Sequence, residues 1–144
     1  LVSDRVFFYK NTGLGSDIET MDDAKGVERI VLTRDFPEHH YLKSQGFENL
    51  ELTVKPVQSM KMLVSKRASL VPMGELAVPN IVKEAKIDPS LIERTNIKLF
   101  EIKLYIAFSK DISDSEVNAW QDALDTIKAS GKQAEIMRKY TSLQ

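Results

Sequence analysis

The sequence contains no cysteine, only two histidines and a single tryptophan. Without cysteine the chain cannot form a disulfide, use a catalytic thiol or hold a metal ion on thiolates. The two histidines, His39 and His40, are adjacent, so on a helix their side chains would point about 100° apart. They also lack the spacing of a His-Glu-x-x-His zinc motif. We therefore expect no metal site and no cofactor.

Excess charge and long apolar runs are lacking as well. The 20 basic and 21 acidic side chains give a net charge of −1, which leaves no surplus of lysine and arginine to neutralise phosphates. We therefore expect no nucleic-acid partner. No apolar run approaches the roughly 18 residues of a membrane span, and no secretory signal opens the chain. Residues 1–8 are typical of a strand already under way, so we expect a mature or truncated form of a longer protein.

The 144 residues, 42% of them apolar, are enough for one domain with a sizeable core. Strand-like runs alternate with helical patterns along the chain. We predict strands at 6–9, 29–33, 50–54, 68–73 and 100–108, and helices at 20–26, 37–44, 56–64, 75–86, 113–131 and 132–140. This order predicts a three-layer α/β fold, with a mainly parallel sheet flanked by helices. Within it, Pro72 marks an edge or a strand end, and Trp120 is interpreted as a core anchor.

Ligands of open α/β sheets bind beyond the carboxyl ends of parallel strands, near helix N-termini. Two predicted strand ends meet this condition, and their residues are Thr33, Arg34, Asp35, Phe36, Gly74 and Glu75. No nucleophile motif and no convincing acid–base pair accompanies them, which favours binding over catalysis. The glycines around Gly13 are interpreted as a turn, because the lysine and hydroxyl of a phosphate loop are missing.

These residues suit a small polar ligand, although each also has a simpler interpretation. Arg34 could hold a carboxylate through two parallel hydrogen bonds, Glu75 could hold an ammonium group, and Phe36 could stack on an apolar moiety. Alternatively, Asp35 caps the following helix and pairs with Arg34, while Gly74 merely allows a turn. For Asp35 the capping role is favoured.

Several segments together resemble the amino-acid-binding family of extracytoplasmic solute-binding proteins, which serve ABC importers. The closest similarity lies in the returning strand and the last helices, where Ile136 to Tyr140 matches the family's I-x-x-K-Y ending. The segments that carry the resemblance are 18–26, 42–50, 62–67, 104–110, 123–131 and 136–140. The resemblance implies one lobe of a periplasmic-binding-protein type II fold. Residues 1–144 would form the second lobe with two hinge strands and the C-terminal helices, and most of the first lobe would be missing.

The same resemblance implies a periplasmic receptor that closes on a small solute without catalysing a reaction, with ABC permease subunits as partners. The chain departs from the family's ligand motifs at three places. Asp35-Phe36 stands where a Gly-Thr/Ser pair is usual, Gly74 where an amine-binding Asp is usual, and Ser69 where another Asp is usual. These departures suit either a small solute other than an ordinary α-amino acid or a receptor that has lost its original ligand.

Three alternatives share this scaffold: the ligand-sensing domain of a membrane signalling receptor, an enzyme, and the effector domain of a DNA-binding regulator. The first is the main alternative. A lone second lobe would also expose apolar surface, which predicts self-association or domain swapping.

Overall fold

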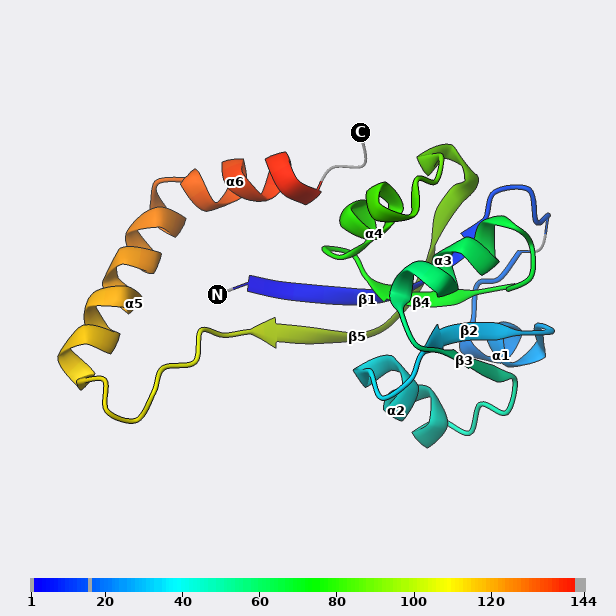
Figure 1. The fold of residues 1–144 in the computed structure, drawn as a ribbon, viewed down its shortest axis with the longest axis horizontal. Helices are drawn as coiled ribbons and strands as arrows, with labels where there is room; N and C mark the ends of the chain where they lie inside the picture. The colour runs from blue at the N-terminus through cyan, green and yellow to red at the C-terminus, as the bar shows by residue number, and fades with distance from the viewer. Residues whose placement is uncertain (1, 16, 142–144) are drawn as a thin grey trace.

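The computed structural model describes residues 2–15 and 17–141 (Figure 1). Strands and helices alternate through most of the chain, and two helices end it. The elements are β1 (Val2–Asn11), α1 (Met21–Gly26), β2 (Ile30–Thr33), α2 (Pro37–Ser44), β3 (Leu50–Thr53), α3 (Pro56–Val64), β4 (Val71–Gly74), α4 (Val78–Ala85), the 3₁₀ helix η1 (Pro89–Leu91), β5 (Ile92–Leu104), α5 (Asp114–Ala129) and α6 (Lys132–Thr141).

Strand β1 pairs with two strands that are far from it in the sequence. It runs antiparallel to both β4 and β5. Strands β2 and β3 pair in parallel, and a parallel bridge between Ile30 and Leu70 joins β2 to the residue before β4. Every strand except β1 therefore runs in the same direction. The carboxyl ends of β2 and β4 consequently lie next to each other at one edge of the sheet.

Alternate side chains of β1 fill two separate cores. Val6 and Phe8 point to the face covered by α1 and α2, whereas Phe7 and Tyr9 point to the face covered by α3 and α4. All four side chains are buried, because the sheet carries helices on both faces. The predicted α/β fold with a sheet between helical layers is confirmed.

Residues 104–141, which we call the arm, extend away from this body and return toward α4 (Figure 1). No residue of α5 or α6 is buried. The interpretation of Trp120 as a core anchor is wrong, since this residue is 60% exposed and its ring lies 6.1 Å from that of Phe108. Its helix is amphipathic, but the described residues provide no layer to cover its apolar face. The arm's exposed large apolar residues are Leu104, Tyr105, Ile106, Ile112, Trp120, Ile127, Ile136 and Tyr140.

Strand β5 differs most from its predicted bounds. It begins at Ile92 and ends at Leu104, whereas the alternation of apolar residues predicted 100–108. The pairing of β5 with β1 contains register shifts. At these shifts the alternation of buried and exposed residues along β5 is interrupted, so the sequence of its first half does not show a regular period of two. Residues 105–108 keep the apolar alternation without a partner strand. Pro72 lies within β4, which is an edge of the three-stranded sheet as predicted.

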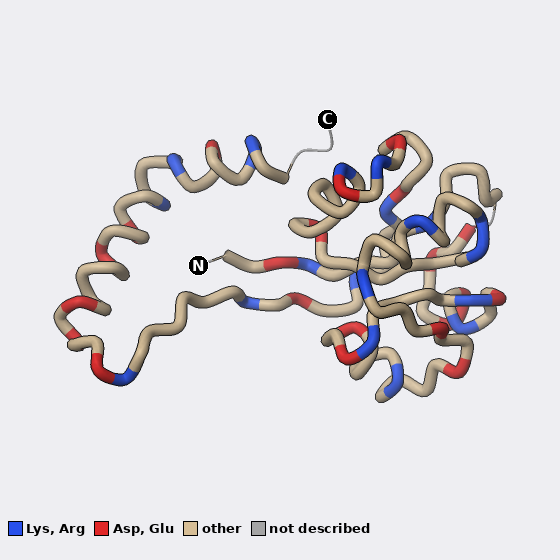
Figure 2. Tube along the Cα trace, in the orientation of Figure 1, with Lys and Arg blue, Asp and Glu red and all other residues tan. Residues whose placement is uncertain are grey.

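Acidic and basic residues are interleaved along the chain (Figure 2), in keeping with the net charge of −1. Among the described residues, no helix has the length and apolar character needed to cross a membrane.

We expect the arm to drive self-association, because its apolar side chains otherwise face water. Sedimentation velocity over a dilution series should show a concentration-dependent dimer or larger species. Replacing Trp120 and Tyr105 by serine should shift the distribution toward monomer. The matched control is Val54→Ser, which changes an equally exposed apolar residue outside the arm. A wild-type chain that stays monomeric at all concentrations contradicts the expectation.

Candidate functional site

The residues predicted after β2 lie at the carboxyl edge of the sheet. Thr33 is buried at the end of the strand, and Arg34 is exposed immediately beyond it. The backbone N–H of Arg34 donates to the carbonyl of Thr53 at 2.9 Å, which continues the pairing of β2 with β3 by one residue. Its guanidinium group makes no hydrogen bond or ion pair with any residue in the ranges 2–15 and 17–141. Arg34 is therefore available to an external carboxylate.

The predicted capping role of Asp35 is wrong. Phe36 is the N-cap residue of α2, and no side chain caps this helix. Asp35 instead adopts a left-handed backbone with φ of 61°, and its N–H donates to Nδ1 of His39 at 3.2 Å. The Asp35 carboxylate lies beside the first turn, with Oδ1 4.0 Å from Nδ1 of His39. The helix opens with Pro37, which has no N–H, and the N–H of His39 donates to the carbonyl of Phe36. The start of α2 therefore does not form an anion site by itself. Phe36, 44% exposed, borders this helix end.

At the end of β4, a carboxylate occupies the space beside Gly74. A Cβ atom on Gly74 would lie 2.8 Å from Cγ of Asp4 and would overlap its Oδ2 atom. The other oxygen, Oδ1, accepts a hydrogen bond from the N–H of Leu76 at 3.1 Å. Burial, more than the nearby charge of Glu75, raises the pKa of Asp4. The glycine is thus required for close approach, and Asp4 supplies an acidic group where residue 74 has none.

A more deeply buried carboxyl group lies on the same face of the sheet as Asp4. Glu38, in the first turn of α2, is only 9% exposed, and its Oε2 atom has no hydrogen-bond partner among the described residues. Burial raises the pKa of Glu38, and the negative charge of Asp4 raises it further, against the lowering effect of its own backbone N–H. Asp4 and Glu38 therefore repel each other when both are ionised.

Glu75 points to the opposite face, toward α4. Its carboxylate forms ion pairs with Arg5, at 2.7 Å, and with Arg94. The Arg94 guanidinium lies over the ring of Phe7, with Cζ 4.3 Å from the ring centre. Glu75 is thus already paired with two cations, which disfavours the predicted role of binding an ammonium group by itself.

The structure therefore brings the six predicted residues to one edge and divides them between two faces. Sequence reasoning missed Asp4, Arg5, Glu38 and Arg94. Asp4 and Arg5 reach the edge because β1 pairs with β4, and Arg94, which is opposite Tyr9 on β5, reaches it through its ion pair with Glu75. For Glu38 the available signal was an acidic residue directly after the proline that opens α2.

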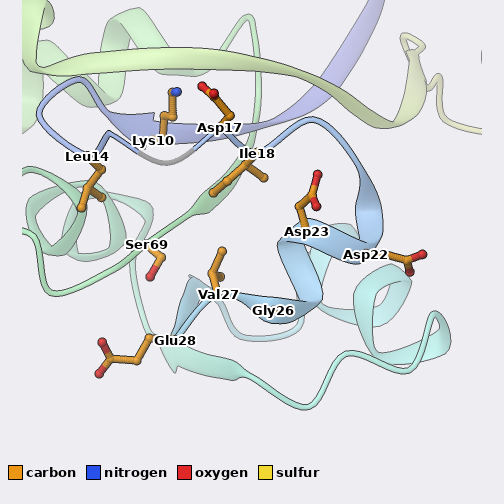
Figure 3. A pocket seen from close by; sticks show the side chains of 10 residues that line it. All are labelled: Lys10, Leu14, Asp17, Ile18, Asp22, Asp23, Gly26, Val27, Glu28 and Ser69. Atoms are coloured by element: carbon orange, nitrogen blue, oxygen red, sulfur yellow. The ribbon is translucent and has the colours of Figure 1, made fainter.

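A hollow of about 530 Å³ lies at the opposite edge of the sheet (Figure 3). Ile18 and Val27 point into it, whereas Asp22 and Glu28 point away. Lys10, also at its border, is 3.8 Å from Glu93. The charged residues that line this hollow are Lys10 and four acidic residues, Asp17, Asp22, Asp23 and Glu28. The carboxyl edge places an unpaired arginine beside a carboxylate, so it is the better candidate for a ligand with both charges.

Comparison with protein-family models and with curated proteins finds no match. Solved structures do match over nearly the whole chain. One is the second substrate-binding domain of a Streptococcus pneumoniae ABC transporter assigned to amino acids, with a TM-score of 0.76, 13% identity and coverage of 98% of this chain and 62% of that one. Another is a binding component assigned to an ABC transporter of Wolinella succinogenes, in complex with lysine, with a TM-score of 0.74, 16% identity and coverage of 97% and 60%.

A histidine kinase sensor domain similar to periplasmic binding proteins also matches, with a TM-score of 0.65, 16% identity and coverage of 96% of this chain and 59% of that one. This chain therefore spans about three fifths of the length of the structures it matches. At these identities the similarity establishes the fold alone. The fold is α/β and matches one lobe of a periplasmic-binding-protein type II domain.

The contact between Asp4 and Gly74 can be tested by a double-mutant cycle. Gly74→Ala should lower the free energy of unfolding by about 1–3 kcal/mol, because the new methyl group displaces the Asp4 carboxylate. In an Asp4→Ala background the same change should cost less than about 0.5 kcal/mol. Urea unfolding followed by circular dichroism measures both values. Equal costs in the two backgrounds would show that the carboxylate is not what excludes a side chain at position 74.

Glu38 should make stability depend on pH. Because folding raises its pKa, the folded state holds the proton more tightly than the unfolded chain does. The contribution of Glu38 to the free energy of unfolding therefore falls as pH rises from the ordinary value of 4.5 through the raised folded value. Glu38→Gln, which cannot ionise, should be more stable than wild type at neutral pH by about 1 kcal/mol and equal to it in acid.

Thermal unfolding between acidic and neutral pH measures this difference. Glu28→Gln is the matched control, because the Glu28 side chain is 87% exposed and its removal should leave the pH profile unchanged. A Glu38→Gln variant less stable than wild type at neutral pH would mean that the carboxylate is stabilised where it lies.

Proposed function

We propose that this chain is the ligand-binding lobe of a two-lobe receptor for a small polar solute, such as an amino acid or a related compound. The observation that carries the proposal is the carboxyl edge itself, where the unpaired Arg34 guanidinium and the Asp4 carboxylate lie on adjacent strand ends. Positive and negative groups at one edge suit a solute that carries both charges.

Each group has a separate role in this proposal. Arg34 binds the anionic part of the solute, and Phe36 covers its apolar part. Asp4, with one oxygen held by Leu76, receives the cationic part. It takes the role expected of Glu75, since the Glu75 carboxylate is paired with arginines. Thr33 and Gly74 shape the backbone of the edge.

Binding is non-covalent in this proposal, and the chain is not an enzyme. The matched structures are binding and sensor domains, which supports a capture role. We propose a periplasmic location, a secretory signal on the full protein and delivery of the solute to ABC permease subunits, in line with the transporter domains among the matches. Two lobes would close on the solute, with β1 and β5 as hinge strands and the missing lobe supplying the other wall.

The second candidate is the ligand-sensing domain of a membrane signalling receptor. The match to a histidine kinase sensor domain supports it as directly as the transporter domains support import. Both functions use the same edge. The two functions differ in what accompanies the two lobes. A membrane span and a kinase domain encoded after the lobes would favour sensing. A neighbouring permease gene would favour import.

Heteronuclear NMR of this chain, titrated with the proteinogenic amino acids and small organic acids, tests solute binding directly. At least one compound should shift the backbone signals of residues 33–36, 74–76 and Asp4 in a saturable way. Arg34→Ala and Asp4→Asn should each weaken that binding about tenfold or more, since each removes a charge-assisted contact. Affinity for an isolated lobe should be modest, with a Kd of about 1 mM.

Arg29→Ala is the matched control, because this arginine lies directly before β2, at the end of the strand opposite Arg34, and pairs with Glu51. It should leave the affinity unchanged. Saturable shifts confined to other parts of the chain, or unaltered binding by both site variants, would reject the proposed edge.

A further inference from the structure

We propose that Glu75 is a positioning residue, which holds the Asp4 carboxylate in place from the opposite face of the sheet. This role depends on the function proposed above, in which Asp4 receives the cationic part of the solute. Glu75 lies on the α4 face, whereas Asp4 lies on the face covered by α1 and α2. Glu75 therefore acts through the backbone of the turn that joins β4 to α4.

This turn, residues 74–76, lies directly against the Asp4 carboxylate. Gly74 leaves the space that the carboxylate fills, since a Cβ atom there would lie 2.8 Å from Cγ of Asp4. The N–H of Leu76 donates to Oδ1 of Asp4 at 3.1 Å. This hydrogen bond lowers the pKa of Asp4, against the larger effect of burial. The position of the carboxylate consequently depends on the conformation of the turn.

Backbone hydrogen bonds fix the two ends of the turn. The N–H of Glu75 donates to the carbonyl of Arg5 at 3.0 Å, which continues the pairing of β1 with β4 by one residue. The N–H of Ala77 donates to the carbonyl of Gly74 at 3.1 Å and leads the chain into α4. The peptide group between Glu75 and Leu76 lies between these two bonds, and its N–H is the one that reaches Asp4.

The Glu75 side chain holds this peptide group from the α4 face. Its carboxylate accepts from Nε of Arg5 at 2.7 Å and from a terminal nitrogen of Arg94. Both guanidinium groups lie over the buried ring of Phe7, with Cζ 5.7 Å and 4.3 Å from the ring centre. One donor comes from β1 and the other from β5, so the carboxylate is held at two points by charge-assisted hydrogen bonds. A side chain fixed in this way also restricts the backbone that carries it.

The charge of Glu75 acts in the same direction as its geometry. Arg5 is the neighbour of Asp4 in β1, and Arg94 reaches the same turn from β5. Removal of Glu75 would leave both guanidinium groups without their carboxylate partner. Their positive charge would then oppose a solute cation at Asp4. Loss of Glu75 is therefore expected to weaken cation binding both through the looser turn and through the uncompensated arginines.

A pH titration of this chain by NMR, without any ligand, tests the positioning role. The amide proton of Leu76 should shift as Asp4 is protonated, because the carboxylate is its acceptor. Asp4→Asn should abolish this shift and so identify it. Glu75→Ala should remove most of its amplitude. Glu93→Ala is the matched control, since Glu93 is next to Arg94 in β5 and pairs instead with Lys10 at 3.8 Å. It should leave the shift unchanged.

Titration with methylammonium chloride at constant ionic strength tests the consequence for binding. Glu75→Ala should raise the Kd for methylammonium. A double variant, Glu75→Ala with Arg94→Gln, loses one charge of each sign and so keeps the net charge of the wild type. It should still raise the Kd about fivefold, which corresponds to the ordering of one side chain on binding.

These outcomes separate position from charge and from the function of the edge. Wild-type affinity in the double variant would show that Glu75 acts through its charge alone, which overturns the positioning role. An unaltered Leu76 shift in Glu75→Ala would overturn it as well. Failure of methylammonium to bind the wild-type chain would reject the cation-binding role of Asp4, whereas the titration of Leu76 would still decide whether Glu75 positions the carboxylate.

Discussion

The rest of the structure depends on β1, whose side chains are buried on both faces of the sheet. Its four central residues place two side chains in each core, so both helical layers pack on the same short strand. The strand also pairs on both edges, with β4 and β5. A polar substitution in this segment would leave an unpaired group in one of the two cores. The layers on the two sides are therefore not independent units.

The same alternation of side chains along β1 distributes the charged groups of the carboxyl edge between the two faces of the sheet. Asp4 projects to the α2 face beside Gly74, and Arg5 projects to the α4 face beside Glu75. One face thus carries two carboxyl groups, Asp4 and Glu38, and the other carries two guanidinium groups around one carboxylate. A shift of β1 by one residue would exchange these sets. The register of one strand consequently determines which charge each face presents.

Local sequence signals predicted most elements, and they failed where a distant partner decides the outcome. The helices predicted at 20–26 and 113–131 are present and begin with capping boxes at Thr20 and Ser113. Such a signal can be found in the sequence because a cap involves residues only a turn apart. Trp120 was assigned to a core because its helix is amphipathic, but an apolar stripe does not reveal whether another layer covers it. The first half of β5 was missed because its irregular pairing with β1 changes the phase of the alternation.

The candidate site shows the same division. Thr33 and Gly74 could be placed from strand ends alone, since the carboxyl ends of neighbouring parallel strands share an edge. Asp4 and Arg94 could not, because they join the edge through antiparallel pairing across much of the chain. Asp35 was assigned as a cap from its residue type, but Phe36 is the N-cap residue, and the left-handed Asp35 lies beside His39 without capping the helix.

The position of β1 also affects how the chain is synthesised. Its partner residues in β4 and β5 come about sixty to one hundred positions later in the chain, so the strand leaves the ribosome long before either can pair with it. Contacts of such high sequence separation slow folding, and an apolar strand with two unpaired edges is prone to aggregation meanwhile. Newly made chains should therefore depend on chaperones until β5 has emerged.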